Sequence, residues 1–168
     1  MRALKKEGYR VHAIAPTEGA SGAFRDIGIP LTHWPLKRRG LNPVRELLSV
    51  IALWRIYRQL RPDLVQHFTA KPNIYGAIAA RLAGVPMVVA SVNGLGYVFI
   101  ERGIRARLIR SVVSLLYRIA FGMSDAVVFQ NREDIEELQL RHLISARRSQ
   151  YIPGGSGVDT GVYSDKAV

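Results

Sequence analysis

The sequence predicts an α/β protein in which a parallel sheet carries helices on both faces. Short apolar segments alternate along the chain with longer segments whose apolar residues recur at helical spacing. The segment from Pro86 to Val92 is almost continuously apolar, as is typical of a strand buried on both faces. Apolar residues make up 48% of the 168 residues, which is the level of an ordinary globular domain.

Strands and helices are expected to alternate from one end of the chain to the other. The expected strands are 9–15, 30–36, 63–68, 86–92, 125–130 and 150–152. The expected helices are 1–8, 24–27, 44–60, 72–82, 103–121 and 131–140. This βα order predicts parallel pairing, because helical crossovers connect parallel strands.

Local signals define the elements of the first half. Gly8 ends the first helix, since glycine commonly follows a helix end. The prolines of strand 30–36 indicate a position near the edge of the sheet. Asn42 caps the long third helix and Pro43 begins it. Pro62 then ends that helix.

The second half has signals of the same kind. Small residues over 76–80 allow the fourth helix to lie close against the sheet, and Gly84 ends it. Several acids lie at the start of the last helix, where they are explained by the positive end of the helix dipole. These acids are Glu133, Asp134, Glu136 and Glu137. No paired carboxylates suited to catalysis are recognised, so the catalytic residues are unknown.

The position of the first strand is unusual. A doubly wound, Rossmann-like domain begins with a strand that lies in the middle of its sheet, whereas this sequence begins within a helix. Without that first strand, strands 9–15 and 63–68 either pair directly or leave two unpaired edges. Each buried, unpaired backbone group costs about 1–3 kcal/mol. We therefore interpret residues 1–168 as a single partial domain of a larger, two-domain protein.

The charge is strongly positive, with 24 basic and 13 acidic residues and a net charge of +11. Five arginines and no acid lie between Arg102 and Arg118, and a second basic cluster lies at 37–39. Such a surface attracts phosphates, nucleic acid or an anionic membrane, although each cluster alone is also compatible with a solvated helix face. The amphipathic helix 103–118 predicts a membrane-surface element. Its expected contacts are Arg105, Arg107 and Arg110.

Several classes of protein are disfavoured by composition. The sequence has no cysteine, which excludes disulfides and thiolate metal sites. Its four histidines lack metal-ligand spacing, so no metal site is predicted. Neither a secretory signal nor an uninterrupted apolar run of about 18 residues is present. No nucleic-acid-binding motif accompanies the arginines, and no nucleic-acid partner is expected.

Polar residues follow two apolar strands that are neighbours in the sequence. The candidate binding residues are His67, Thr69, Lys71 and Asn73 after one strand, and Asn93, Gly94 and Gly96 after the next. Ligands of open α/β sheets bind at the carboxyl ends of the strands. Both loops therefore predict a site for a polar ligand. A strand-end cap at His67 and an ordinary turn at 93–94 are the alternatives.

The motif of residues 67–76, followed by 79–86, resembles the amino-terminal half of bacterial glycosyltransferases of family 4, which are retaining GT-B enzymes. The resemblance is to the branch that adds sugars to undecaprenyl-diphosphate-linked acceptors in surface polysaccharide or glycoprotein biosynthesis. The segments 93–99, 125–134 and 152–159 are also similar to this branch. Together these matches extend over most of the chain, from about residue 3 to residue 163.

The resemblance implies that this domain binds the lipid-linked sugar acceptor. A nucleotide sugar is the expected donor, held by a carboxyl-terminal domain that this chain lacks, so the chain alone is expected to be inactive and to need no cofactor. In this reading Lys71 meets a phosphate, and the glycine loop approaches an oxyanion. Thr69, Asn73 and Asn93 bond sugar hydroxyls. The expected location is cytoplasmic, at the inner face of the plasma membrane.

Two other functions remain open. A nucleotide-binding α/β protein would need a Gly-x-Gly-x-x-Gly motif after a strand, but Phe99 stands where the third glycine would be. A nucleic-acid-binding module is suggested by charge alone.

Overall fold

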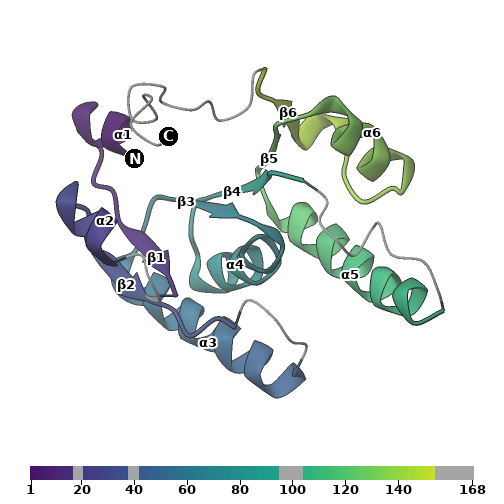
Figure 1. Cartoon of the computed structure of the whole chain (residues 1–168), viewed down its shortest axis with the longest axis horizontal. Coiled ribbons are helices and arrows are strands. Elements are labelled where there is room, and N and C mark those ends of the chain that lie inside the picture. Colours follow the sequence, from purple (N-terminus) through teal and green to yellow (C-terminus); the bar gives the residue numbers. More distant parts are fainter. Residues whose placement is uncertain (17–20, 38–41, 95–103, 154–168) are drawn as a thin grey trace, which may run out of the picture. The chain divides into compact units, whose positions relative to one another are not determined.

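The structure is a computed structural model that describes residues 1–16, 21–37, 42–94 and 104–153 (Figure 1). The chain divides into two compact units, Met1–Leu60 and Arg61–Val168. Each unit has its own parallel sheet, which confirms the predicted α/β class with parallel strands.

The first unit contains a small two-stranded sheet. Its elements are α1 (Arg2–Lys6), β1 (Ala13–Ala15), α2 (Ser21–Asp26), β2 (Leu31–His33) and α3 (Pro43–Leu60). The two strands pair in parallel, with Ala13 opposite Leu31. The indole nitrogen of Trp34 donates to the carbonyl of Ser49 at 2.9 Å, which ties the end of β2 to α3. Asn42 caps α3 as predicted, since its Oδ1 accepts from the backbone nitrogen of Arg45 at 3.2 Å.

The second unit contains a four-stranded parallel sheet in the order β3-β4-β5-β6. Its elements are β3 (Leu64–Phe68), α4 (Ala70–Ala83), β4 (Met87–Val92), α5 (Ile104–Met123), β5 (Ala126–Phe129), α6 (Arg132–Leu140), a 3-10 turn (Ala146–Arg148) and β6 (Ser149–Tyr151). Helices α4 and α5 pack against each other, and α6 packs against β5 (Figure 1). Val88, Val127 and Phe129 on the central strands are fully buried.

The predicted small-residue helix packs as expected against the sheet. Gly76, Ala77, Ala79 and Ala80 of α4 are all buried, and α4 contacts both β3 and β4. The helix begins at Ala70, two residues earlier than predicted. Pro72 lies in its first turn, where a backbone N–H would have no partner within the helix, so the proline is tolerated.

The strands of the first unit are shorter than predicted. The prediction of a strand over 9–15 is wrong for its first residues, because only Ala13–Ala15 pair with β2. Strand 30–36 likewise reduces to Leu31–His33. Within the described residues, β1 pairs with β2 in one sheet, and β3 pairs with β4 in the other.

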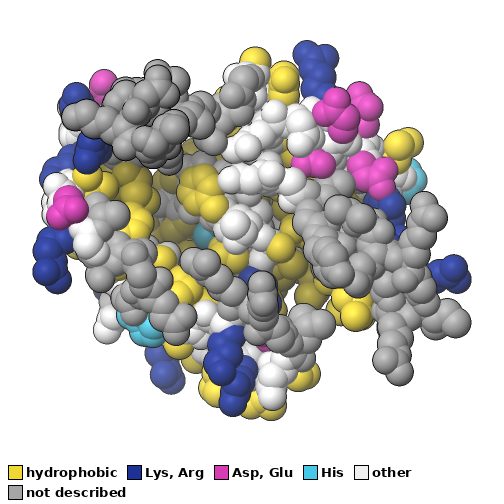
Figure 2. Space-filling view, in the orientation of Figure 1, with side chains coloured by type: hydrophobic (Ala, Val, Ile, Leu, Met, Phe, Trp, Pro, Cys, Tyr) yellow, Lys and Arg dark blue, Asp and Glu magenta, His cyan; other side chains and the backbone are white. Residues whose placement is uncertain are grey.

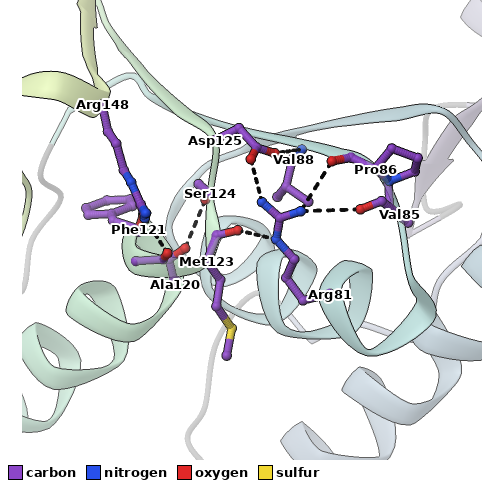
Figure 3. A network of polar contacts seen from close by, with 11 residues as sticks. Arg81, Val85, Pro86, Val88, Ala120, Phe121, Met123, Ser124, Asp125 and Arg148 are labelled. Carbon is purple, nitrogen blue, oxygen red and sulfur yellow. Dashed lines mark hydrogen bonds and ion pairs between the residues drawn. The ribbon is translucent and has the colours of Figure 1, made fainter.

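A polar network joins the elements at the amino-terminal edge of the larger sheet (Figure 3). Arg81 on α4 pairs with Asp125 at 2.8 Å and donates to the carbonyl of Met123 at 2.6 Å. The other carboxylate oxygen of Asp125 accepts from the backbone nitrogen of Val88 at 2.7 Å. Burial acts to raise the pKa of Asp125, but the Val88 bond and the Arg81 guanidinium outweigh it and lower that pKa. This edge is thus held by structural contacts, whereas the carboxyl-terminal edge carries the candidate site.

Candidate functional site

The two predicted loops lie at the same edge of the larger sheet. Strands β3 and β4 are parallel neighbours, and Phe68 at the end of β3 lies opposite Ser91 on β4. Thr69 and Asn93 therefore both follow the carboxyl ends of adjacent strands, where open α/β sheets bind ligands. The loop after β5 reaches the same edge, because Phe129 lies opposite Val92.

Thr69 has an unusual backbone conformation at the start of α4. Its φ is 71° and its ψ is 165°, a region populated almost only by glycine. A β-branched residue there stores strain of about 1–3 kcal/mol. The Thr69 side chain is exposed and makes no capping hydrogen bond. Such strain is common at ligand-binding sites, and the exposed hydroxyl fits the predicted site.

The first turn of α4 is electrostatically suited to an anion. It contains no acidic residue, although carboxylates are favoured at a helix N-terminus. It instead carries Lys71, which is half-buried. The lysine adds its own charge to the positive end of the helix dipole. This turn therefore combines two sources of positive potential at the sheet edge.

Asn73 does not occupy the exposed position that direct contact with a sugar requires. Its side chain is 1% exposed. Its amide nitrogen donates to the carbonyl of Ser91 at 2.9 Å, and its amide oxygen accepts from the Ser91 backbone nitrogen at 3.3 Å. The prediction that Asn73 bonds sugar hydroxyls is therefore corrected, because both ends of its amide bond to β4 inside the protein.

His67 is also buried, with 6% of its surface exposed. Its ring lies against Gly76 of α4, so closely that a Cβ placed on this glycine would be 2.4 Å from the ring Cδ2 and Nε2 atoms. Burial lowers the pKa of His67 to about 4, so the ring is neutral at pH 7. The prediction that His67 contacts the acceptor is corrected in the same way, because α4 covers the side chain.

The second loop begins with two exposed residues, Asn93 and Gly94. Gly94 has a φ of 146°, a conformation that side chains rarely adopt, although a Cβ would meet nothing within 4 Å. The glycine is therefore required by the backbone rather than by space. Gly96 lies outside the described residues.

Two polar residues near the site were not predicted. Ser91, on β4, is buried and accepts from the side chain of Gln66 on β3 at 2.9 Å through its hydroxyl. Asn131, after β5, caps α6 through a 2.8 Å bond from the backbone nitrogen of Asp134. The contact between Ser91 and Gln66 could have been anticipated from the alternation of side chains along β3. Asn131 could have been anticipated because asparagine is a common helix cap.

A hollow in the second unit lies at the opposite edge of the sheet. It is lined by residues that precede β5 and β6, among them Arg118, Phe121 and Arg148. A guanidinium nitrogen of Arg148 donates to the carbonyl of Phe121 at 2.9 Å. This arginine offsets the negative end of α5, so the contact is structural and separate from the predicted loops.

The predicted membrane-surface residues lie on α5. Arg107 is exposed and Arg110 is half-buried, whereas the Arg105 side chain lies outside the described residues. Exposed apolar side chains lie on the same helix, namely Ile109, Val112, Leu115 and Ile119. Acidic side chains gather instead over α6 (Figure 2). Among the described helices, none is long and apolar enough to cross a membrane.

The family model described as Glycosyl transferase 4-like matches residues 1–131. The chain therefore belongs to this glycosyltransferase family, as its loop motif predicted. It is 31% identical over 136 residues to the N,N'-diacetylbacillosaminyl-diphospho-undecaprenol alpha-1,3-N-acetylgalactosaminyltransferase of Campylobacter jejuni, covering 81% of this chain and 36% of the relative. It is 26% identical over 153 residues to the UDP-Gal:alpha-D-GlcNAc-diphosphoundecaprenol alpha-1,3-galactosyltransferase of Escherichia coli, covering 90% of this chain and 38% of that protein.

A solved structure confirms the fold. The crystal structure of MurG from Acinetobacter baumannii matches 96% of this chain and 41% of its own chain, with a TM-score of 0.61 and 17% identity. This likeness supports the predicted Rossmann-like, GT-B class. The chain thus spans little more than a third of the length of the curated relatives it matches.

Proposed function

We propose that this chain is the acceptor-binding half of a retaining glycosyltransferase. The complete enzyme transfers a sugar from a nucleotide sugar to a lipid-linked glycan, in the biosynthesis of a surface polysaccharide or a glycoprotein. Both curated relatives are named for acceptors linked to diphospho-undecaprenol, and one is named for UDP-Gal. The acceptor proposed for this chain belongs to the same chemical class.

One observation carries the assignment of the site. The parallel register of β3 and β4 places the turn at Thr69 and Lys71 beside the turn at Asn93 and Gly94. A lipid-linked diphosphate is anionic, and the start of α4 offers a helix N-terminus and a lysine with no acid in its first turn. In this proposal Lys71 binds a phosphate, while Thr69 and Asn93 bond sugar hydroxyls.

The backbone of the second loop has a separate role in the proposal. Without a Cβ, the N–H groups of Gly94 and Gly96 approach an anionic oxygen closely. In this proposal a carboxyl-terminal domain binds the nucleotide-sugar donor, and the catalytic residues are unknown. We expect the 168-residue chain by itself to need no cofactor and to be inactive.

Acceptor binding is tested with a soluble probe, a farnesyl-diphosphate-linked N-acetylhexosamine, titrated into the 168-residue chain by calorimetry. Lys71→Ala should weaken binding by about tenfold or more, because a charge-assisted hydrogen bond is worth about 1.5–3 kcal/mol. Lys6→Ala is the matched control, since Lys6 is exposed on α1. Equal losses in both variants, or equal affinity for a farnesyl glycoside without the diphosphate, would contradict the proposal.

The same proposal places the protein at the inner face of the plasma membrane, as a peripheral cytoplasmic protein. Helix α5 meets the anionic lipid surface through Arg105, Arg107 and Arg110, and its exposed apolar residues enter the interface. Each basic residue near such a surface contributes about 1 kcal/mol. This attraction is consistent with the net charge of +11.

Vesicle co-sedimentation tests this placement with phosphatidylglycerol and phosphatidylcholine vesicles. The double substitution Arg107→Glu and Arg110→Glu should abolish most binding to the anionic vesicles. Arg55→Glu with Arg58→Glu changes the charge equally on exposed positions of α3 and is the control. Equal binding to both lipids, or equal loss in both double variants, argues against the membrane assignment.

A further inference from the structure

The buried amide of Asn73 connects the two loops of the proposed site. Asn73 lies in the first turn of α4 and bonds through both ends of its side-chain amide to the backbone of Ser91 on β4. The backbone C=O and N–H of Ser91 are thus both hydrogen-bonded to one side-chain amide, in the way that a neighbouring strand would otherwise bond them. Ser91 lies two residues before Asn93. The side chain is 1% exposed, so it can support these loops only through contacts inside the protein.

The backbone N–H of Asn73 makes the first i→i−4 hydrogen bond of α4, to the residue at the end of the other loop. This N–H donates to the carbonyl of Thr69 at 3.0 Å. Thr69 has the strained backbone angles φ 71° and ψ 165°, and such a conformation persists only where neighbouring contacts determine it. The Asn73 side chain therefore links the first turn of α4, which follows this strained residue, to the end of β4.

We infer that Asn73 is a positioning residue, which fixes the Thr69 turn against the end of β4 so that the two loops form one acceptor surface. The inference rests on the proposed function, because it assigns a supporting role within that site. Asn73 itself touches no acceptor. Its loss should therefore change the arrangement of Thr69 and Gly94, and weaken binding only through them.

Two substitutions test this role in the 168-residue chain. Asn73→Ala removes both bonds to Ser91. Asn73→Asp keeps the shape and the oxygen that accepts from the Ser91 N–H, but it replaces the donor with an oxygen that faces the Ser91 carbonyl. Ser124→Ala is the control, because Ser124 is equally buried and its hydroxyl donates to a backbone carbonyl at the opposite edge of the sheet.

The first measurement is the affinity for the farnesyl-diphosphate-linked N-acetylhexosamine. We expect both Asn73 variants to bind at least tenfold more weakly than the unchanged chain, and Ser124→Ala to bind within twofold of it. For Asn73→Asp the affinity should recover as the pH is lowered from about 7.5 to about 5.5, because a buried carboxyl is protonated in this range and then donates to Ser91 again. His67 stays neutral over this range, since burial lowers its pKa to about 4.

The second measurement needs no ligand and separates this inference from the proposed function. The amide resonances of Thr69 and Gly94 should both shift in Asn73→Asp at neutral pH and return at the lower pH, while Ser124→Ala leaves them unchanged. Unshifted resonances, or affinities in both Asn73 variants within twofold of the unchanged chain, would overturn the inference. If the unchanged chain does not bind the probe, the proposed function fails, and the resonances alone decide the role of Asn73.

Discussion

The contact between Gly76 and His67 makes a quantitative prediction about packing. Alanine at position 76 would place a Cβ 2.4 Å from two atoms of the His67 ring, about 1.1 Å closer than the roughly 3.5 Å of a favourable carbon contact. The ring is 6% exposed, so it has little room to move. Overpacking of this kind costs about 1–3 kcal/mol.

Helix propensity acts in the opposite direction. Replacing glycine by alanine within a helix gains about 0.5–1 kcal/mol. Gly76→Ala should therefore lower the free energy of unfolding by about 0–2.5 kcal/mol. A change of 1 kcal/mol shifts Tm by about 2–4 °C in a chain of this size.

Gly122 provides the matched control. It lies in the last turn of α5, and a Cβ there would meet nothing within 4 Å. Gly122→Ala should therefore be neutral or stabilising by up to about 1 kcal/mol. The difference between the two variants isolates the contact with His67, because the propensity gain is largely common to both.

Urea unfolding followed by far-ultraviolet circular dichroism measures both variants. The double variant His67→Ala with Gly76→Ala completes a mutant cycle, in which the interaction energy should be about 1–3 kcal/mol, because removing the ring removes the clash. The reasoning is refuted if Gly76→Ala is as stable as Gly122→Ala, or if the cycle shows no interaction.

Three further outcomes follow from the same structure. Burial lowers the pKa of His67 from 6.5 in the unfolded chain to about 4 in the folded chain, so between these pH values only the unfolded chain is protonated at His67. The free energy of unfolding should therefore fall as the pH is lowered, by up to about 1.4 kcal/mol per pH unit. Urea unfolding of the unchanged chain and of His67→Gln at several pH values checks this, and an equal pH slope in both would contradict it. Thr69→Gly should relieve the backbone strain, so that the free energy of unfolding is unchanged or raised by up to about 2 kcal/mol. The same substitution should weaken binding of the diphosphate probe. A clear loss of stability would argue against a strained turn. Asn131→Ala should cost about 1 kcal/mol and Asn131→Ser much less, because only the first removes the helix cap. Thermal unfolding distinguishes the two variants.

The sequence alone predicted the alternation of strands and helices and the parallel pairing of the strands. Parallel pairing follows from the βα alternation, and it brings the loops after β3 and β4 together without any knowledge of side chains. The glycine required at position 94 was also recognisable, because a glycine after a strand commonly marks a turn.

Side-chain direction at the site was predicted less well, although signals were present. His67 follows Val65 by two residues, so both point to the same, buried face of β3. Asn73 precedes Gly76, Ala77 and Ala80 by three, four and seven residues, which places it on the buried face of α4. A polar residue type was taken to indicate exposure, whereas periodicity indicated burial.

The strained angles of Thr69 had no comparable signal. A β-branched residue is normally excluded from positive φ, so no propensity argument would place it there. The bond from the Asn73 N–H to the Thr69 carbonyl is the first i→i−4 bond of α4. Any residue other than proline at position 73 would make it, so it does not account for the angles at Thr69.

Burial beneath α4 explains why His67 is neutral. Desolvation disfavours the charged imidazolium and so lowers its pKa. With its pKa lowered to about 4, the ring fills space and adds no charge at pH 7. The positive potential at this edge then comes from the start of α4 and from Lys71, which is half-buried. In the proposed function this potential attracts the diphosphate of the acceptor, whereas the buried neutral groups set the shape of the edge.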